Sequence, residues 1–172
     1  GVKSIGYAAF ISCNKLTTIT LPASLTSFNG TAIAGLSRLT EVKVADGNNS
    51  FKFENGMLLS KDGKTMYMAL LTLTEINVSN GVVSILGDSL IGSNATKIIL
   101  PDTVSSNFGG MVFNGMNKLT TIELSSTSKN LKLVDGNLYS YDGKRFIKYM
   151  GSSKNFTVPE GVETVVSYCI TK

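Results

Sequence analysis

The chain has no histidine, no tryptophan and only two cysteines among its 172 residues. Without histidine it lacks the commonest general base and the commonest metal ligand near neutral pH. Two distant cysteines cannot supply the ligand set of a zinc site. No apolar run approaches the roughly 18 residues of a membrane span, and no secretory signal opens the sequence. We therefore expect no catalytic residues, no metal and no cofactor.

Charge is sparse and unclustered. The 16 basic and 12 acidic residues give a net charge of +4 and are scattered singly, whereas nucleic-acid binders usually gather Lys and Arg on one stripe. We expect no nucleic-acid partner. Paired-carboxylate hydrolysis needs two carboxyls in a cleft, which a flat array of strands does not offer. We instead expect Glu41 and Glu75 on adjacent strands beside Lys43 and Lys97, on a solvated, charge-mixed face that includes Glu123.

What the sequence does have is internal repetition. The alternation of apolar and polar residues in Leu16-Thr17-Thr18-Ile19-Thr20-Leu21-Pro22 returns along the whole chain. Alternation with period two places the apolar pair on one face of a strand and the residues between on the other. We predict six short strands, marked by the pairs Ile19/Leu21, Val42/Val44, Ile76/Val78, Ile98/Leu100, Ile122/Leu124 and Phe156/Val158.

The opposite face of these strands is polar at every position except Ile99, so we expect it to meet solvent. Its two columns are Thr18, Glu41, Glu75, Lys97, Thr121 and Asn155, and Thr20, Lys43, Asn77, Ile99, Glu123 and Thr157.

A longer period of 80 residues overlies the strands, because Gly1-Val2, Gly81-Val82 and Gly161-Val162 coincide under that shift. We expect one solenoid over residues 1–172, with superunits 1–80 and 81–160 and the start of a third at 161–172. Since the third superunit stops before its strand, we expect the chain to be a fragment of a larger protein. The bridges that lead into the strands are short, which predicts short helical turns on the convex side.

Each superunit also carries an insertion, at residues 55–67 and 135–147. Asp62-Gly63 and Asp142-Gly143 each lie between two strand-like runs, and Asp-Gly is a strong signal for a tight hairpin turn with positive φ at both central residues. We predict two β-hairpins that turn at these dipeptides.

Cys13 and Cys169 fall in different repeats, too far apart in a solenoid for a disulfide, whose Cα atoms must lie within about 7 Å. Cys13 aligns with Leu36 in the next repeat and with Met116 in a later one. These are core positions, so we expect two free, buried thiols.

The chain resembles the BspA-type leucine-rich repeat. The resemblance is carried by Val-x-x-Ile-Gly and Ala-Phe-x-x-Cys-x-x-Leu-Thr-x-Ile-x-Leu-Pro within residues 2–22, the hairpin motif Gly-x-Leu-Tyr-Ser-x-Asp-Gly-Lys, and Val-Pro-Glu-Gly-Val at 158–162. It covers essentially the whole chain. Residues 86–100 depart from the pattern, because Ala95 or Thr96 stands where Leu is expected and one residue is missing from the spacing.

The resemblance implies a curved, mostly-β solenoid with short parallel strands on the concave face, used for binding and not for catalysis. It also implies a bacterial surface protein, either secreted or anchored in the outer membrane through a segment outside this chain, that adheres to a host extracellular-matrix or plasma protein or to another cell. The alternatives are a structural spacer and a glycan-binding module. The candidate binding residues on the concave face are Thr18, Thr20, Glu41, Lys43, Glu75, Asn77, Lys97, Ile99, Thr121 and Glu123.

Apolar anchor residues for a partner would come from Ile99 and from Tyr139, Tyr141 and Tyr149 on the second insertion. The alternative interpretation is that these tyrosines pack the hairpin onto the solenoid.

Overall fold

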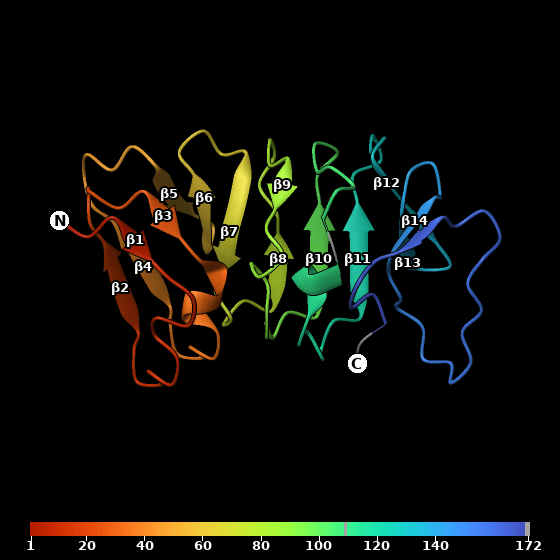
Figure 1. The fold of residues 1–172 in the computed structure, drawn as a ribbon, viewed down its shortest axis with the longest axis horizontal. Coiled ribbons are helices and arrows are strands. Elements are labelled where there is room, and N and C mark those ends of the chain that lie inside the picture. The colour runs from red at the N-terminus through yellow and green to blue at the C-terminus, as the bar shows by residue number, and fades with distance from the viewer. Residues whose placement is uncertain (109, 171–172) are drawn as a thin grey trace.

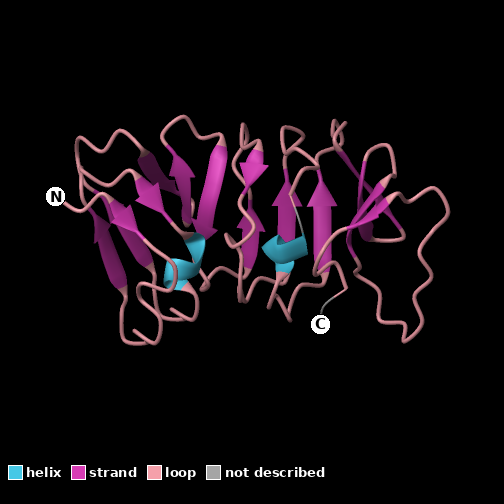
Figure 2. Ribbon diagram, in the orientation of Figure 1, coloured by secondary structure: helices cyan, strands magenta, loops and turns pink. Residues whose placement is uncertain are grey.

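The computed structural model describes residues 1–108 and 110–170. It is a mostly-β solenoid with almost no helix (Figures 1 and 2), as the repeats predict. Its parallel strand ladder has two groups of strands. The first pairs β2 (Thr18–Leu21) with β4 (Glu41–Val44), and the second orders β8 (Glu75–Asn77), β10 (Lys97–Leu100) and β11 (Thr121–Leu124). We call the solvent-facing side of these strands the ladder face.

Period-two alternation explains these five strands. In β2 the burial alternates exposed, buried, exposed, buried, and Ile19 and Leu21 point into the core. Although residues 86–100 depart from the repeat spacing, β10 keeps the register of the ladder, with Ile98 opposite Ile122. Ala95, fully buried, occupies the slot where the pattern expects Leu. A smaller side chain therefore fills this position without shifting the strand.

The sixth predicted strand is wrong, because residues 149–163 contain no strand. The equivalent strand β8 is held by β10, which lies one turn further along the chain, after β9 (Ser84–Ile85). After Phe156 the described residues contain only β15 (Thr164–Val165), the counterpart of β9, and it pairs with β14 (Arg145–Lys148) as β9 pairs with β7 (Thr65–Ala69). No described strand is the counterpart of β10. With no parallel neighbour, the alternating pattern alone does not form a strand. Phe156 packs its ring on Phe146 and Tyr149.

The expectation that Glu41 and Glu75 lie on adjacent strands is also wrong. Among the described residues no ladder pairing joins β4 to β8. The chain between them forms an antiparallel sheet of β5 (Phe51–Glu54), β6 (Met57–Ser60) and β7 (Thr65–Ala69). The first insertion therefore separates the two groups of ladder strands.

The second insertion repeats this arrangement 80 residues later with β12 (Leu131–Val134), β13 (Asn137–Ser140) and β14. Both predicted hairpins are confirmed, and Asp62-Gly63 does lie in the β6–β7 connection. Only Gly63 has positive φ there. The two-residue turns with positive φ at both positions are Asn55-Gly56 and Asp135-Gly136, at the other end of β6 and β13.

Across from the ladder lie very short strands and helical turns. β1 (Ser4–Ile5) pairs in parallel with β3 (Ser27–Phe28), and β9 (Ser84–Ile85) pairs with β7. The helices are single 3₁₀ turns, η1 (Gly30–Ile33) and η2 (Gly110–Phe113). The predicted short helical turns are confirmed. Asn29 caps η1 by accepting a hydrogen bond from the Thr31 amide at 2.9 Å.

The two cysteines are free, as expected, but only Cys169 is buried. Cys13 is exposed, so the expectation of two buried thiols is wrong for it. Its equivalents Leu36 and Met116 are buried between a preceding and a following turn. Cys13 lies in the first turn of the chain and is covered from one side only.

Candidate functional site

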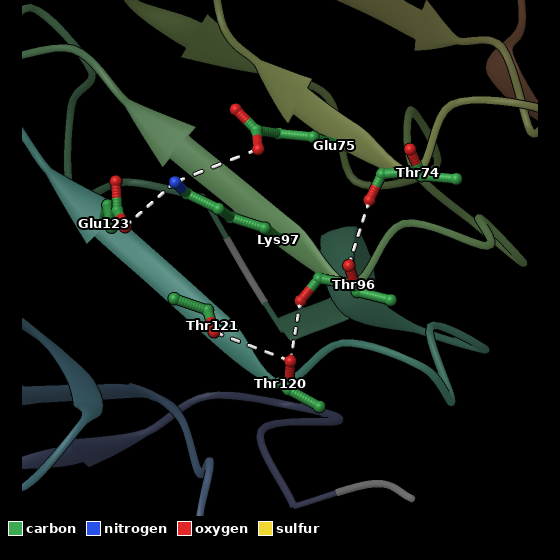
Figure 3. Close-up of polar contacts among 7 residues, drawn as sticks. All are labelled: Thr74, Glu75, Thr96, Lys97, Thr120, Thr121 and Glu123. Carbon is green, nitrogen blue, oxygen red and sulfur yellow. Dashed lines mark hydrogen bonds and ion pairs between the residues drawn. The ribbon is translucent and has the colours of Figure 1, made fainter.

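The central part of the ladder face carries a row of three charged residues, one from each of three neighbouring strands (Figure 3). Glu75, Lys97 and Glu123 lie on β8, β10 and β11. The register places Lys97 opposite Glu75 on one side and diagonal to Glu123 on the other. The Lys97 Nζ is 3.0 Å from a carboxylate oxygen of Glu123 and 3.8 Å from one of Glu75. The alternating pattern produces this row because it sends all three side chains outward.

The row is not electrically balanced. The hydrogen bond from Lys97 to Glu123 raises the pKa of the Lys97 ammonium above its ordinary value, which favours the charged form. One ammonium thus serves two carboxylates, which leaves one net negative charge on the row. Such solvent-exposed pairs contribute little to the stability of the fold. The row is better suited to meeting a charged partner than to stabilising the fold.

Threonine hydroxyls fix the spacing of the turns at the start of the same strands (Figure 3). The Oγ1 of Thr96 donates to the Thr74 carbonyl at 3.2 Å, and the Oγ1 of Thr120 donates to the Thr96 carbonyl at 3.1 Å. Each turn is therefore tied to the preceding one by a side chain in addition to the strand hydrogen bonds. These bonds set the spacing of the strands that carry the charged row.

The first two ladder strands carry a separate group of polar residues. Thr18 lies opposite Glu41 and Thr20 opposite Lys43. The Thr18 hydroxyl donates to Glu41 at 3.4 Å, and Lys43 lies 3.5 Å from the same carboxylate. This group is charge-neutral.

The structure thus divides the ten predicted binding residues between two sheets. The N-terminal patch consists of Thr18, Thr20, Glu41 and Lys43. The central patch consists of Glu75, Asn77, Lys97, Ile99, Thr121 and Glu123. Asn155 and Thr157, from the polar columns, lie outside any strand and belong to neither patch.

A hollow of 620 Å³ adjoins the central patch where the ladder is interrupted. Glu75 and Asn77 line one side, and Glu54 and Asn55 of the first insertion line the other. Sequence reasoning missed Glu54 and Asn55, because it assigned the tight turn to Asp62-Gly63. The signal that could have found them is the dipeptide Asn55-Gly56, since Asn-Gly favours the same turn.

The tyrosines divide between packing and exposure. Tyr139 is buried, which raises the pKa of its phenol, and its ring meets Phe146 edge-on at a centroid distance of 5.0 Å. Tyr149 packs on Phe156 at 4.8 Å. The packing interpretation therefore holds for both. Tyr141 is 55% exposed and remains open to a partner.

Within the described residues, no three carboxylate or thiol side chains gather closely enough to hold a metal ion. No helix in that part of the chain is long and apolar enough to cross a membrane.

Comparison with protein families finds one match, which covers nearly the whole chain. The model of the BspA type leucine-rich repeat region matches residues 1–58 and 63–172 in 6 copies. A search of curated proteins finds no match.

Among solved structures, a leucine-rich repeat protein from Eubacterium ventriosum shares this fold, with a TM-score of 0.54 at 18% identity, over 74% of this chain and 41% of that one. A leucine-rich cell surface protein from Faecalibacterium prausnitzii gives a TM-score of 0.43 at 19% identity, over 94% of this chain and 54% of that one. The pneumococcal vaccine antigen PcpA also gives 0.43, at 18% identity, over 90% of this chain and 31% of that one. The chain spans less than two thirds of each.

Proposed function

Because this chain belongs to the BspA-type leucine-rich repeat family, we propose that it is a non-catalytic binding module of a bacterial surface or secreted protein. The partner we propose is a host extracellular or plasma protein, or a protein on another cell. The observation that carries the proposal is the central patch. Six outward side chains are held in register on three strands, and their charged row has an unbalanced carboxylate.

The size of the patch sets the binding mode. Three strands spaced about 4.8 Å apart span about 10 Å between the outer two. A standard protein interface needs roughly 800 Å² from each partner, more than the central patch offers alone. Binding through this module is therefore weak per patch, and avidity over several patches supplies the strength.

The test compares two pairs of substitutions that remove matched ion pairs. Lys97→Ser with Glu123→Ser removes charges from the central patch, and Lys144→Ser with Glu163→Ser removes an exposed pair at 2.7 Å that lies off the ladder. Both variants and the parent chain are first checked for equal thermal unfolding. Binding is then measured to immobilised fibronectin, fibrinogen and a panel of polysaccharides.

Loss of protein binding in the Lys97 and Glu123 variant alone supports recognition through the central patch. A third variant, with Glu41 and Lys43 both changed to Ser, reports whether the N-terminal patch contributes. Equal binding by all variants, or binding to no protein, refutes the proposal and favours a structural spacer. Binding confined to the polysaccharides favours the glycan-binding alternative.

A further inference from the structure

The interruption of the ladder leaves one edge of β8 open. β8 is bonded to β10, and within the described residues no strand pairs with its other edge. The Thr74 carbonyl and the Val78 amide are both bonded toward β10. Because backbone groups alternate between the two edges of a strand, the amides and carbonyls of Glu75 and Asn77 face the open edge. An unpaired edge of this kind is a template for an added strand.

The open edge borders the 620 Å³ hollow described above. The far wall is the Asn55-Gly56 turn, which is held close to the start of β8. A Cβ built on Gly56 would come within 2.9 Å of a Leu73 methyl group. The turn that forms this wall therefore packs against the residue that leads into β8.

The acidic residues that line the hollow favour a cationic ligand. Glu54 and Glu75 contribute carboxylates from opposite walls. Glu54 is 3.3 Å from Lys52, but Glu75 is 3.8 Å from Lys97, which is closer to Glu123. Glu75 and Glu123 share Lys97, and Glu75, which faces the hollow beside the open edge, is the less neutralised of the two. A cationic group complements it.

We propose that the open edge of β8 takes an extended segment of a partner protein as an added strand, and that a Lys or Arg side chain of this segment enters the hollow between Glu54 and Glu75. The inference rests on the proposed function, because it specifies the partner chemistry of the central patch. Main-chain hydrogen bonds to β8 supply affinity in this mode, and the side-chain site supplies specificity.

The second superunit provides an internal control. A hollow of 410 Å³ recurs beside the Asp135-Gly136 turn, lined by Val134, Asp135 and Pro159 among others. There the strand equivalent to β8 does not form. The second hollow lies beside a comparable turn but has no open strand edge, so we expect no partner segment to bind there.

The experiment uses the 172-residue chain, labelled with ¹⁵N, and two peptides: acetyl-Thr-Val-Arg-Val-Thr-amide and the same peptide with Gln in place of Arg. Titration with the Arg peptide is expected to shift the backbone amides of Glu75 and Asn77 and the side-chain amide of Asn55. The amide of Asp135 is expected not to move. The Gln peptide is expected to bind about 3- to 5-fold more weakly, the size of one exposed ion pair.

Two variants test the side-chain contact. Glu75→Gln is expected to reduce the preference for Arg about 3- to 5-fold. Glu41→Gln is the matched control, because Glu41 and Glu75 have side-chain exposures of 50% and 51% and pair with a lysine at 3.5 and 3.8 Å. Equal effects of the two variants, or equal binding of the Arg and Gln peptides, would overturn the charge selection.

Two further Arg peptides, N-methylated at alternate amides, test the added strand. One of the two must lose binding, because alternate amides face opposite edges. Unchanged binding of both overturns strand addition. If the peptides leave β8 unperturbed while the Lys97 and Glu123 variant still loses its protein partner, this inference fails and the proposed function stands. If the peptides bind as expected and no protein partner is affected, the proposed function fails alone.

Discussion

Replacing Asn48 with Ala should destabilise the fold more than any surface change. Asn48 is 1% exposed, and its side chain makes four hydrogen bonds. Its amide nitrogen donates to the carbonyls of Pro22 and Leu25 at 2.9 and 3.1 Å, in the preceding turn. Its oxygen accepts from the amides of Ser50 and Phe51 at 2.9 and 2.8 Å, at the start of β5. One side chain thus joins a ladder turn to the first insertion.

The magnitude follows from these contacts. A hydrogen bond contributes about 1 kcal/mol net, and a buried partner left unsatisfied costs about 1–3 kcal/mol. Of the four partners, the Pro22 carbonyl retains a second donor, the Leu25 amide at 3.1 Å. We therefore expect Asn48→Ala to lower the free energy of unfolding by about 3–4 kcal/mol. The chain has no tryptophan, so urea unfolding is followed by far-UV circular dichroism.

The position one superunit later provides the control. Ser128 makes only local bonds with Leu131, at 3.1 and 3.4 Å. Ser128→Ala should therefore cost no more than about 1 kcal/mol. If Asn48→Ala loses less than about 1 kcal/mol, or no more than Ser128→Ala, the reasoning from buried hydrogen bonds is refuted.

The remaining predictions concern pH, thiol access and a turn. Hydrogen bonds from the Ser60 hydroxyl and the Lys64 amide lower the pKa of Asp62 below its ordinary 3.8. This stabilisation is therefore present above pH 3.8 and is lost as the pH falls through the lower pKa of the folded state, and Asp62→Asn should flatten that decline in urea unfolding. Iodoacetamide should modify exposed Cys13 readily and buried Cys169 only on unfolding, as read by mass spectrometry, since burial raises the pKa of Cys169. Gly56→Ala should cost about 1–2 kcal/mol in urea, because φ is positive and Leu73 obstructs the new methyl group.

Each of these has a control on the chain itself. Asp142→Asn removes the equivalent carboxylate one superunit later, which accepts from the Ser140 hydroxyl and the Lys144 amide and has its pKa lowered by these bonds, so it should flatten the acid decline in the same way. Equal alkylation of both cysteines in the folded chain would contradict the burial of Cys169. Gly136→Ala has the same positive φ as Gly56 but no atom within 4 Å of the new methyl. If Gly136→Ala lowers the free energy of unfolding as much as Gly56→Ala does, contact with Leu73 does not contribute to the cost of Gly56→Ala.

The sequence predicts the elements that depend on local pattern. Period-two alternation is a property of a few consecutive residues, and it identified β2, β4, β8, β10 and β11 and the ten side chains that the ladder face presents. The repeat spacing likewise placed both insertions. The assignment of those ten residues to binding stays a prediction.

What the sequence could not predict depends on neighbours. Phe156 and Val158 alternate as well as Ile76 and Val78, but they lack a following strand to pair with. Cys13 occupies a core slot in the repeat but has a turn on one side only. The hollow beside Glu75 arises from how the insertion packs between two strand groups, which no local pattern encodes.

The interruption between β4 and β8 also divides the apolar interior. One buried cluster includes Leu21, Val42 and Leu58, and the other includes Met57, Leu59 and Ile76. β6 therefore alternates its side chains between the two clusters, with Leu58 on one side and its neighbours on the other. β7 divides its side chains in the same way, with Met68 in the first cluster and Met66 in the second, so two neighbouring strands join the two cores. Amide exchange from β2 should then differ from that of β10, because the two strands belong to different cores, and β6 and β7 are the elements that couple them.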